Sequence, residues 1–241
     1  MVDIHCHILP GLDDGADNIE ESIRMARLAV DGGTQVIVVT PHSNIPDSFQ
    51  NYFGKTYAEV FKEFRLRLRA ENIPLKILPG HEIFATGNFI ELIKKKRLLT
   101  LNDSDYPLVE FAFTEPAGSV YSKLQLLLAE GFTPIVAHPE RYAFVAEDDS
   151  APFRLKNMGC LLQINKGSLK GAFGKNAYVA SSNMISYELA DFIASDAHSP
   201  YMRTPFLADA LEMLSEIHSP EYAERLLVRN PALVLLNKKI N

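Results

Sequence analysis

Short apolar runs alternate with amphipathic helical patterns along the whole 241-residue chain, and this alternation limits the fold more than any other feature. The runs are rich in Ile, Val, Leu and Phe, which is typical of buried strands. Strands are predicted at Val2–His7, Gln35–Thr40, Leu75–Glu82, Tyr106–Phe111, Thr133–His138, Cys160–Asn165 and Asp191–Asp196. Such alternation favours a parallel sheet with right-handed crossovers. Because no glycine-rich nucleotide turn follows the first strand, we expect a closed, irregular α/β barrel in a single domain.

Helices are predicted between these strands and after the last one. We expect Asp17 to cap the first helix and Gly32-Gly33 to end it, with Glu20 and Glu21 at its positive end. Other helices are expected near Lys55–Glu71, Asn88–Leu98, Val120–Glu130 and Tyr178–Leu189. Two more are expected after Pro205, the last beginning at Ser219-Pro220-Glu221.

Composition excludes several classes of protein. A hydrophobic fraction of 47% with 22% charged residues is that of a well-packed globular protein. A net charge of −6 argues against a general nucleic-acid binder. No apolar run reaches the ~18–20 residues of a membrane span, and the N-terminus has no signal-type stretch. Cys6 and Cys160 allow at most one disulfide, so a cytoplasmic protein without membrane insertion is expected.

Metal-binding side chains fall where the predicted strands end. His5 and His7 are two residues apart and therefore leave the first strand on one face. The other candidates are His42, Glu82, Glu110, His138, Asp196 and His198, with Asp14 in the first loop. A single histidine at a strand end is usually structural, but strand ends of a barrel meet at one mouth. Burying four carboxylates there without cations would be costly, so the sequence predicts a metal centre.

Charge at this mouth favours an anionic substrate. Three divalent cations would outweigh the four candidate carboxylates, and Arg141 and Arg203 follow two of the strands closely. Guanidinium groups match phosphate oxygens geometrically, which favours a phosphate ester. Neither cysteine is followed six residues later by arginine, so the loop of cysteine-nucleophile phosphatases is absent.

Three further features have weaker interpretations. His81 alternates with Glu82 and should point away from the mouth. The segment Gly167–Lys175 does not fit a nucleotide-binding loop and is expected to be a loop at the mouth. The segment Ser43–Gly54 is either a lid beside the site or a surface excursion.

The motifs together resemble the PHP (polymerase and histidinol phosphatase) superfamily over essentially the whole chain. They are His5-x-His7, Asp13-Asp14-Gly15, Thr40-Pro41-His42, Gly80-His81-Glu82, His138-Pro139-Glu140-Arg141 and Ser195-Asp196-Ala197-His198. The segments Asp3–Pro10 and Leu101–Ser104 are similar to manganese-dependent protein-tyrosine phosphatases found with bacterial tyrosine kinases of capsule and exopolysaccharide assembly. The resemblance implies a distorted (β/α)7 TIM-like barrel, the PHP fold, with residues 1–241 as one phosphatase domain.

The same resemblance implies three divalent metal ions, with manganese favoured and iron or zinc as alternatives in purified protein. One ion would be held by His5, His7, Glu82 and Asp196. A second would use Glu82 as a bridge with Glu110 and His138, and the third would use Asp14, His42 and His198. The expected catalytic residues are Arg141, Arg203 and His198. A hydroxide generated by a metal pair would attack phosphotyrosine, for which the Tyr-rich C-terminal tail of a partner kinase is the expected substrate.

Three alternatives remain at this point. A histidinol-phosphate or nucleotide phosphatase would use the same barrel. An amidohydrolase shares His-x-His on the first strand, but it normally needs a carboxylated lysine or two later histidines, and the fourth strand here has no lysine. A non-catalytic regulatory module would have lost ligands, whereas all nine positions are filled.

Overall fold

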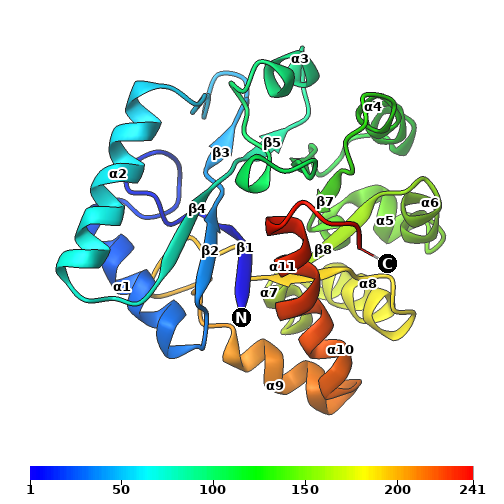
Figure 1. Ribbon diagram of the computed structural model, residues 1–241. Helices are drawn as coiled ribbons and strands as arrows, with labels where there is room; N and C mark the ends of the chain where they lie inside the picture. Colours follow the sequence, from blue (N-terminus) through cyan, green and yellow to red (C-terminus); the bar gives the residue numbers. More distant parts are fainter. Residues whose placement is uncertain (241) are drawn as a thin grey trace.

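The strands of the protein form a curled parallel sheet (Figure 1). The computed structural model describes residues 1–240. Its strands are β1 (Val2–Cys6), β2 (Val36–Val39), β3 (His42–Ser43), β4 (Lys76–Pro79), β5 (Glu82–Phe84), β6 (Leu108–Glu110), β7 (Ile135–Ala137), β8 (Leu161–Asn165) and β9 (Phe192–Ala194). Hydrogen bonds join them as β1-β2-β4 and as β3-β5-β6-β7-β8-β9, and each pairing is parallel.

The predicted strand Leu75–Glu82 is wrong as one element, because it forms β4 and β5 with a break between them. The break interrupts the pairing but keeps its register, since Val39 pairs with Pro79 before it and His42 with Glu82 after it. Proline has no N–H to continue a ladder. At Gly80 the backbone also runs too close to its neighbour for a side chain, because a Cβ would lie 2.8 Å from Val38 Cγ1.

The first and last strands close the barrel at its carboxyl end. A parallel bridge joins Cys6 to Ala197. The N–H of His7 donates to the Ala197 carbonyl at 2.9 Å, and the N–H of Asp196 donates to the His5 carbonyl at 2.9 Å. Strand β2 continues into β3, and β4 continues into β5. If each of these pairs counts as one strand, the ring has seven strands, which confirms the expected distorted α/β barrel.

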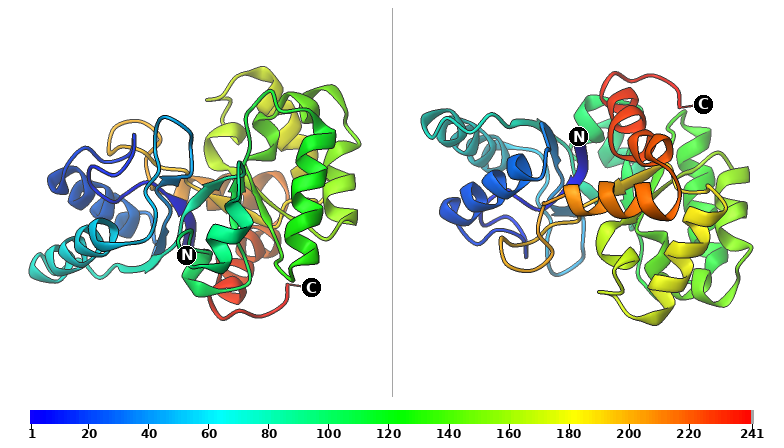
Figure 2. Two further views of the ribbon diagram at one scale, coloured as in Figure 1. Left: turned by 90° about the horizontal axis from the view of Figure 1, so that it is seen from above. Right: turned by 90° about the horizontal axis from the view of Figure 1, so that it is seen from below.

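Most helices cover the outside of this ring, whereas α11 packs against its interior cluster through Val234 (Figure 1). They are α1 (Ile19–Asp31), α2 (Lys55–Ala70), α3 (Phe89–Lys94), α4 (Ala117–Ala129), α5 (Ala143–Glu147), α6 (Ala151–Asn157), α7 (Lys166–Leu169), α8 (Lys175–Ser186), α9 (Ala208–Ile217), α10 (Pro220–Glu224) and α11 (Asn230–Leu235). A π-helical stretch, Arg225–Arg229, joins the last two. Helices α1 and α2 lie on one side of the barrel, and α4, α5, α6 and α8 lie on the other (Figure 2). Among residues 1–240, no helix is both long and apolar enough to cross a membrane.

The N-terminal cap of α1 differs from the prediction. Asn18, not Asp17, caps the helix, because its side-chain oxygen accepts from the N–H of Glu21 at 3.0 Å. Ser219 caps α10 in the same way by accepting from Tyr222, so the expected start of the last helical segment is confirmed.

Apolar side chains fill the barrel interior below the carboxyl ends of the strands, and polar groups occupy the carboxyl end itself. Along the strands, Val109, Val136 and Ile193 pack outward in the cluster that includes the helices. Their neighbours belong to a separate interior cluster that includes Leu108, Ile135, Phe192 and, from α11, Val234. The interior cluster therefore supports the polar groups from below.

Candidate metal centre

The structure brings all nine candidate metal ligands to the carboxyl end of the barrel. His5 lies in β1, His42 begins β3, Glu82 begins β5 and Glu110 ends β6. The others lie in the segments after strands, and they are His7, Asp14, His138, Asp196 and His198. Of the nine, only Asp14 is exposed and His42 half-buried, whereas the remaining seven are buried.

Four of these side chains form a compact group. Nε2 of His5 lies 3.2 Å from Glu82 Oε2 and 3.4 Å from Asp196 Oδ1. Nε2 of His7 lies 3.3 Å and 3.5 Å from the same two oxygens. Donor atoms about 2.1 Å from a tetrahedral ion are separated by about 3.4 Å. The spacing of this group therefore matches the shell of one cation.

Two further groups adjoin the first. Nε2 of His138 lies 2.8 Å from Glu82 Oε1 and 3.6 Å from Glu110 Oε1. Oδ1 of Asp14 lies 3.5 Å from Nε2 of both His42 and His198. The groups overlap. A donor atom of His7 lies within 4.8 Å of donor atoms of Asp14, His42 and His198, and a carboxylate oxygen of Glu110 lies within the same limit of donor atoms of His42 and Glu82. The carboxylate of Glu82 is the common neighbour of most of the cluster.

Unpaired donor atoms within the cluster fit bound cations. Nε2 of His198 is buried without a hydrogen-bond partner, and Nδ1 of His42 and Oε2 of Glu82 face each other at 2.9 Å without hydrogen-bond geometry. Leaving a buried polar atom without a partner costs free energy, and native proteins rarely do so. Imidazole nitrogens and carboxylate oxygens are ligands that manganese, iron and zinc accept.

The carboxylates of the cluster perturb one another. Burial and the neighbouring Glu82 carboxylate raise the pKa of Glu110 to about 8. Burial would also raise the pKa of Glu82, but His5 and His42 hold it well below its usual range. Burial together with the adjacent His7 lowers the pKa of His198 to about 2, so that imidazole is neutral and free to bind a cation.

Two residues support the ligands from behind: Asp13, which was named from the sequence only as part of a motif and without a role, and Gln163, which was not named from it. Nδ1 of His7 donates to Asp13 Oδ2 at 2.7 Å, and Nδ1 of His5 donates to Gln163 Oε1 at 2.8 Å. Both contacts turn the other nitrogen, Nε2, toward the cluster, as such partners do in metal sites. Burial would raise the pKa of Asp13, but His7 and His42 lower it to about 2. Gln163 could have been found by strand alternation, because it is two residues before the end of β8.

The backbone turns sharply where the ligands leave the strands. His138 and Asp196 have φ angles of 33° and 48°, in the left-handed region that costs free energy for residues other than glycine. Gly15 is also required locally, since a Cβ there would lie 2.1 Å from the His7 carbonyl oxygen. The loop that carries Asp13 and Asp14 is thus held tightly against the first strand.

Arg141 and Arg203 reach the same mouth. Arg203 Nη2 lies 2.6 Å from Asp196 Oδ2, and Arg141 Nη1 lies 3.7 Å from that oxygen. The guanidinium of Arg141 is sandwiched between two rings, with Cζ 4.4 Å from the centroids of both Phe113 and Phe173. Cζ of Arg203 lies 5.4 Å from the Phe173 ring. Phe173 belongs to the segment Gly167–Lys175, which therefore contacts both arginines.

Apolar side chains form part of the wall at the entrance to the metal cluster. The hollow above the ligands has a volume of about 480 Å³, and its wall includes Ile45, Phe49, Phe84 and Phe113. The Phe49 ring is stacked against His42, with 5.9 Å between ring centroids. Two of the wall residues come from the segment Ser43–Gly54, so this segment lies beside the site. Asn51 fastens it, because its Nδ2 donates to the carbonyls of Leu12 and His42.

The residues predicted to lie outside the site do so. Nδ1 of His81 accepts from the N–H of Leu99 at 2.8 Å, and its ring packs on Tyr57. Cys6 and Cys160 are both free and buried. Neither thiol lines the hollow above the ligands.

Comparison with known proteins finds relatives that match the chain over its whole length. The model of a family described as capsular polysaccharide synthesis, CpsB/CapC, matches residues 1–236. Tyrosine-protein phosphatase YwqE of Bacillus subtilis is 38% identical over 100% of this chain and 93% of its own. The putative tyrosine-protein phosphatase CapC of Staphylococcus aureus is 36% identical with the same coverage. Tyrosine-protein phosphatase CpsB of Streptococcus pneumoniae is 31% identical over 100% of both chains.

Solved structures agree with these relatives. A structure from a study of YwqE from Bacillus subtilis and CpsB from Streptococcus pneumoniae, described as unique metal-dependent tyrosine phosphatases, has a TM-score of 0.90. It is 37% identical and covers 100% of this chain and 96% of its own. A histidinol phosphate phosphatase from Lactococcus lactis has a TM-score of 0.55 at 16% identity over 94% of both chains, a likeness that concerns the fold alone.

Proposed function

This chain belongs to the CpsB/CapC family of capsular polysaccharide synthesis, and from that premise we propose that its mouth hydrolyses phosphotyrosine in proteins. The observation that carries the proposal is the cluster of nine nitrogen and oxygen ligands beside Arg141 and Arg203. The relatives of this chain are tyrosine phosphatases, and the solved relative is described as metal-dependent. Metal-dependent phosphotyrosine hydrolysis also suits the residues of the site.

Three divalent cations, with manganese favoured over iron and zinc, would occupy the cluster. His5, His7, Glu82 and Asp196 would hold one ion. Glu82, Glu110 and His138 would hold a second, and the third would be held by Asp14, His42 and His198. Nitrogen–oxygen distances of 2.8 to 3.6 Å within these sets are compatible with this division, and His42, 2.9 Å from Glu82, lies where the sets adjoin.

When bound, the cations lower the pKa of water to produce a nucleophile near neutral pH and neutralise charge on the phosphate. Arg141 and Arg203 bind the phosphate oxygens that face away from the ligands and stabilise the charge of the transition state. The rings of Phe113 and Phe173, each 4.4 Å from Cζ of Arg141, restrict the orientation of its guanidinium and so maintain the direction of its donors. His198 is neutral and holds its Nε2 toward the cluster.

The apolar wall supports an aromatic phosphate ester as substrate. The phenyl ring of phosphotyrosine can pack on Phe49, Phe84 and Phe113, which line the entrance. A phosphoserine side chain is shorter and has no ring to contact this wall. Phenolate, with a pKa of about 10, is also a fairly good leaving group, so no strong general acid is required.

The physiological substrate we propose is a phosphorylated bacterial tyrosine kinase, through its C-terminal tyrosine cluster, in the cytoplasm. Relatives named for capsule synthesis support this setting. Small-molecule phosphate hydrolysis on the same barrel, of histidinol phosphate or a nucleotide, is the competing function, since a phosphatase of that kind has this fold.

A metal-reconstituted assay tests the proposal. We expect manganese-loaded enzyme to hydrolyse a phosphotyrosine peptide with a higher kcat/KM than histidinol phosphate, and to lose activity in a chelator. His138→Ala should abolish turnover, whereas His218→Ala, which changes a histidine outside the cluster, should retain it. Full activity after complete metal removal would refute the proposed chemistry.

A further inference from the structure

A row of hollows leads from the mouth of the barrel past Arg141 across the surface. The hollow above the metal cluster shares Phe113 and Arg141 with a neighbouring hollow. That hollow shares Ala146 and Asn176 with a third, which shares Val145, Asp149 and Ala180 with a fourth. The four hollows therefore follow one another across the surface, with α5 and α6 on one side and α8 on the other, and this row is called the groove below.

Small side chains keep this groove open. Ala143 and Ala146 of α5 line it, and so do Ala177 and Ala180 of α8. Residues three apart share a helix face, so each helix presents a pair of alanines to the groove. A larger side chain at any of these four positions would narrow the passage.

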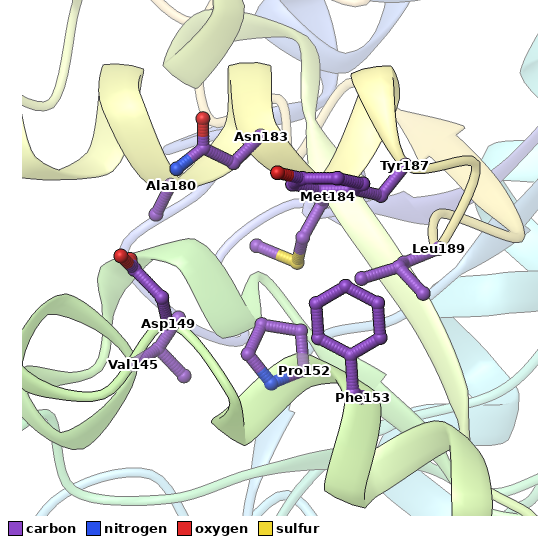
Figure 3. Close-up of a pocket in the computed structure, with 9 residues that line it drawn as sticks. All are labelled: Val145, Asp149, Pro152, Phe153, Ala180, Asn183, Met184, Tyr187 and Leu189. Carbon is purple, nitrogen blue, oxygen red and sulfur yellow. The ribbon is translucent and has the colours of Figure 1, made fainter.

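The groove ends in an apolar pocket, which Figure 3 shows from close by. Its volume is about 230 Å³, and its apolar lining includes Pro152, Phe153, Met184, Tyr187 and Leu189. An apolar cavity of about 150 Å³ holds a benzene molecule, so this pocket has room for an aromatic ring. Exposed fractions of 40% for Phe153 and 65% for Tyr187 leave two large aromatic surfaces uncovered at its edge. The two rings meet edge to face, with centroids 5.5 Å apart.

We propose that this groove binds an extended segment of the phosphoprotein substrate and that its end pocket takes an aromatic side chain of that segment. The inference rests on the proposed function, because the proposed function is what puts phosphotyrosine at the carboxyl end of the barrel. The position of the groove beside the mouth points to this occupant, because a chain whose phosphotyrosine lies at the metals can leave past Arg141, where the groove begins. The only charged residues of the two outer hollows, Asp149 and Lys175, have opposite signs, so a neutral segment fits.

The length of the groove sets the spacing between phosphotyrosine and the aromatic residue. Along α8, the lining runs from Asn176 to Tyr187, which is about 16 Å at 1.5 Å per residue. An extended chain covers about 3.3 Å per residue, so about five residues span that part. Adding the passage beside Arg141, we expect the aromatic residue about five to eight positions from phosphotyrosine.

A series of synthetic peptides tests this proposal. Each contains one phosphotyrosine in a Gly/Ser background, with a single phenylalanine placed from one to ten positions away on either side. We expect KM to fall at least fivefold when phenylalanine lies five to eight positions away on one side, with kcat nearly unchanged. Phenylalanine at one or two positions should have no such effect, because it cannot reach the pocket.

Two variants and a matched control locate the effect. Ala146→Trp fills the middle of the groove at an exposed position, and Tyr187→Ala removes one wall of the pocket. Both should raise KM for the favoured peptide to that of the peptide without phenylalanine. Ala58→Trp introduces the same bulk at an exposed position in α2, on the other side of the barrel, and should retain the preference. Hydrolysis of p-nitrophenyl phosphate reports separately on the catalytic centre.

The outcomes separate the groove from the proposed function. Equal KM for all peptides, or a preference that survives both variants, overturns the groove while leaving the phosphatase intact. A wild-type dimer that Ala146→Trp dissociates, measured by light scattering, makes the groove a contact between copies and also overturns the proposal. Failure to hydrolyse any phosphotyrosine peptide overturns the proposed function itself.

Discussion

The stacking of Phe173 on both arginines leads to a quantitative prediction. Phe173→Leu retains an apolar side chain but removes the aromatic face that Arg141 and Arg203 contact at 4.4 and 5.4 Å. The side chains of these arginines are 20% and 30% exposed, so the contacts are partly desolvated. A cation–π contact contributes about 0.5–1 kcal/mol when exposed and about 2 kcal/mol when desolvated. We therefore expect a loss of about 1–2 kcal/mol, or about 5- to 30-fold in kcat/KM for a phosphotyrosine peptide.

A double-mutant cycle distinguishes positioning of the arginines from a general structural effect. In an Arg141→Gln background, Phe173→Leu should cost clearly less than it does in the wild type, because one of its two cationic partners is absent. Phe173→Tyr keeps the ring and should restore most of the activity. The inhibition constant of inorganic phosphate should rise in parallel, since phosphate binding uses the same arginines.

Gly167→Ala is a second variant that tests the position of the Phe173 ring. A Cβ at Gly167 would lie 2.8 Å from Phe173 Cε2, so the ring must shift while its chemistry is unchanged. We expect a smaller loss of kcat/KM than in Phe173→Leu, without a change in metal content. Equal losses from Phe173→Leu in the wild-type and Arg141→Gln backgrounds would refute the reasoning, as would a Phe173→Tyr variant as impaired as the leucine variant.

Three further results are expected. Asp13→Asn removes the carboxylate that orients His7, so metal affinity should fall about 10- to 100-fold in a competition titration with a chelating dye; an unchanged affinity would contradict this role. Gly15→Ala should displace the adjoining loop, because its Cβ would lie 2.1 Å from the His7 carbonyl, and elemental analysis should find fewer metal ions per chain; a wild-type metal content would contradict that. Burial raises the pKa of Cys160 to about 12 and that of Cys6 well above its usual range, so iodoacetamide at pH 8 should modify neither thiol in the folded enzyme. Rapid modification of either thiol by the reagent would contradict this burial.

Much of the fold could be predicted from the sequence because its signals are local. Apolar runs between amphipathic stretches indicate strands and helices, and parallel strands must end at a common edge. Nine residues at or near those ends were therefore expected to meet, and they lie together in the structure. The errors were local too: Asn18 replaced Asp17 as a cap because its side chain reaches the N–H of Glu21. The break between β4 and β5 depends on how closely Gly80 approaches Val38, which sequence periodicity does not encode.

The amino-acid order by itself determined which chemical groups this protein has and at which end of the barrel they stand, since backbone periodicity and chain direction fix both. Only the tertiary structure decided how these groups are supported and what surrounds them. Gln163 behind His5, the two rings beside Arg141 and the groove between α5 and α8 all join segments distant in the sequence. Such contacts depend on ring closure and on the packing of individual side chains, so strand alternation could place Gln163 on the inner face of β8 but could not give its contact with His5.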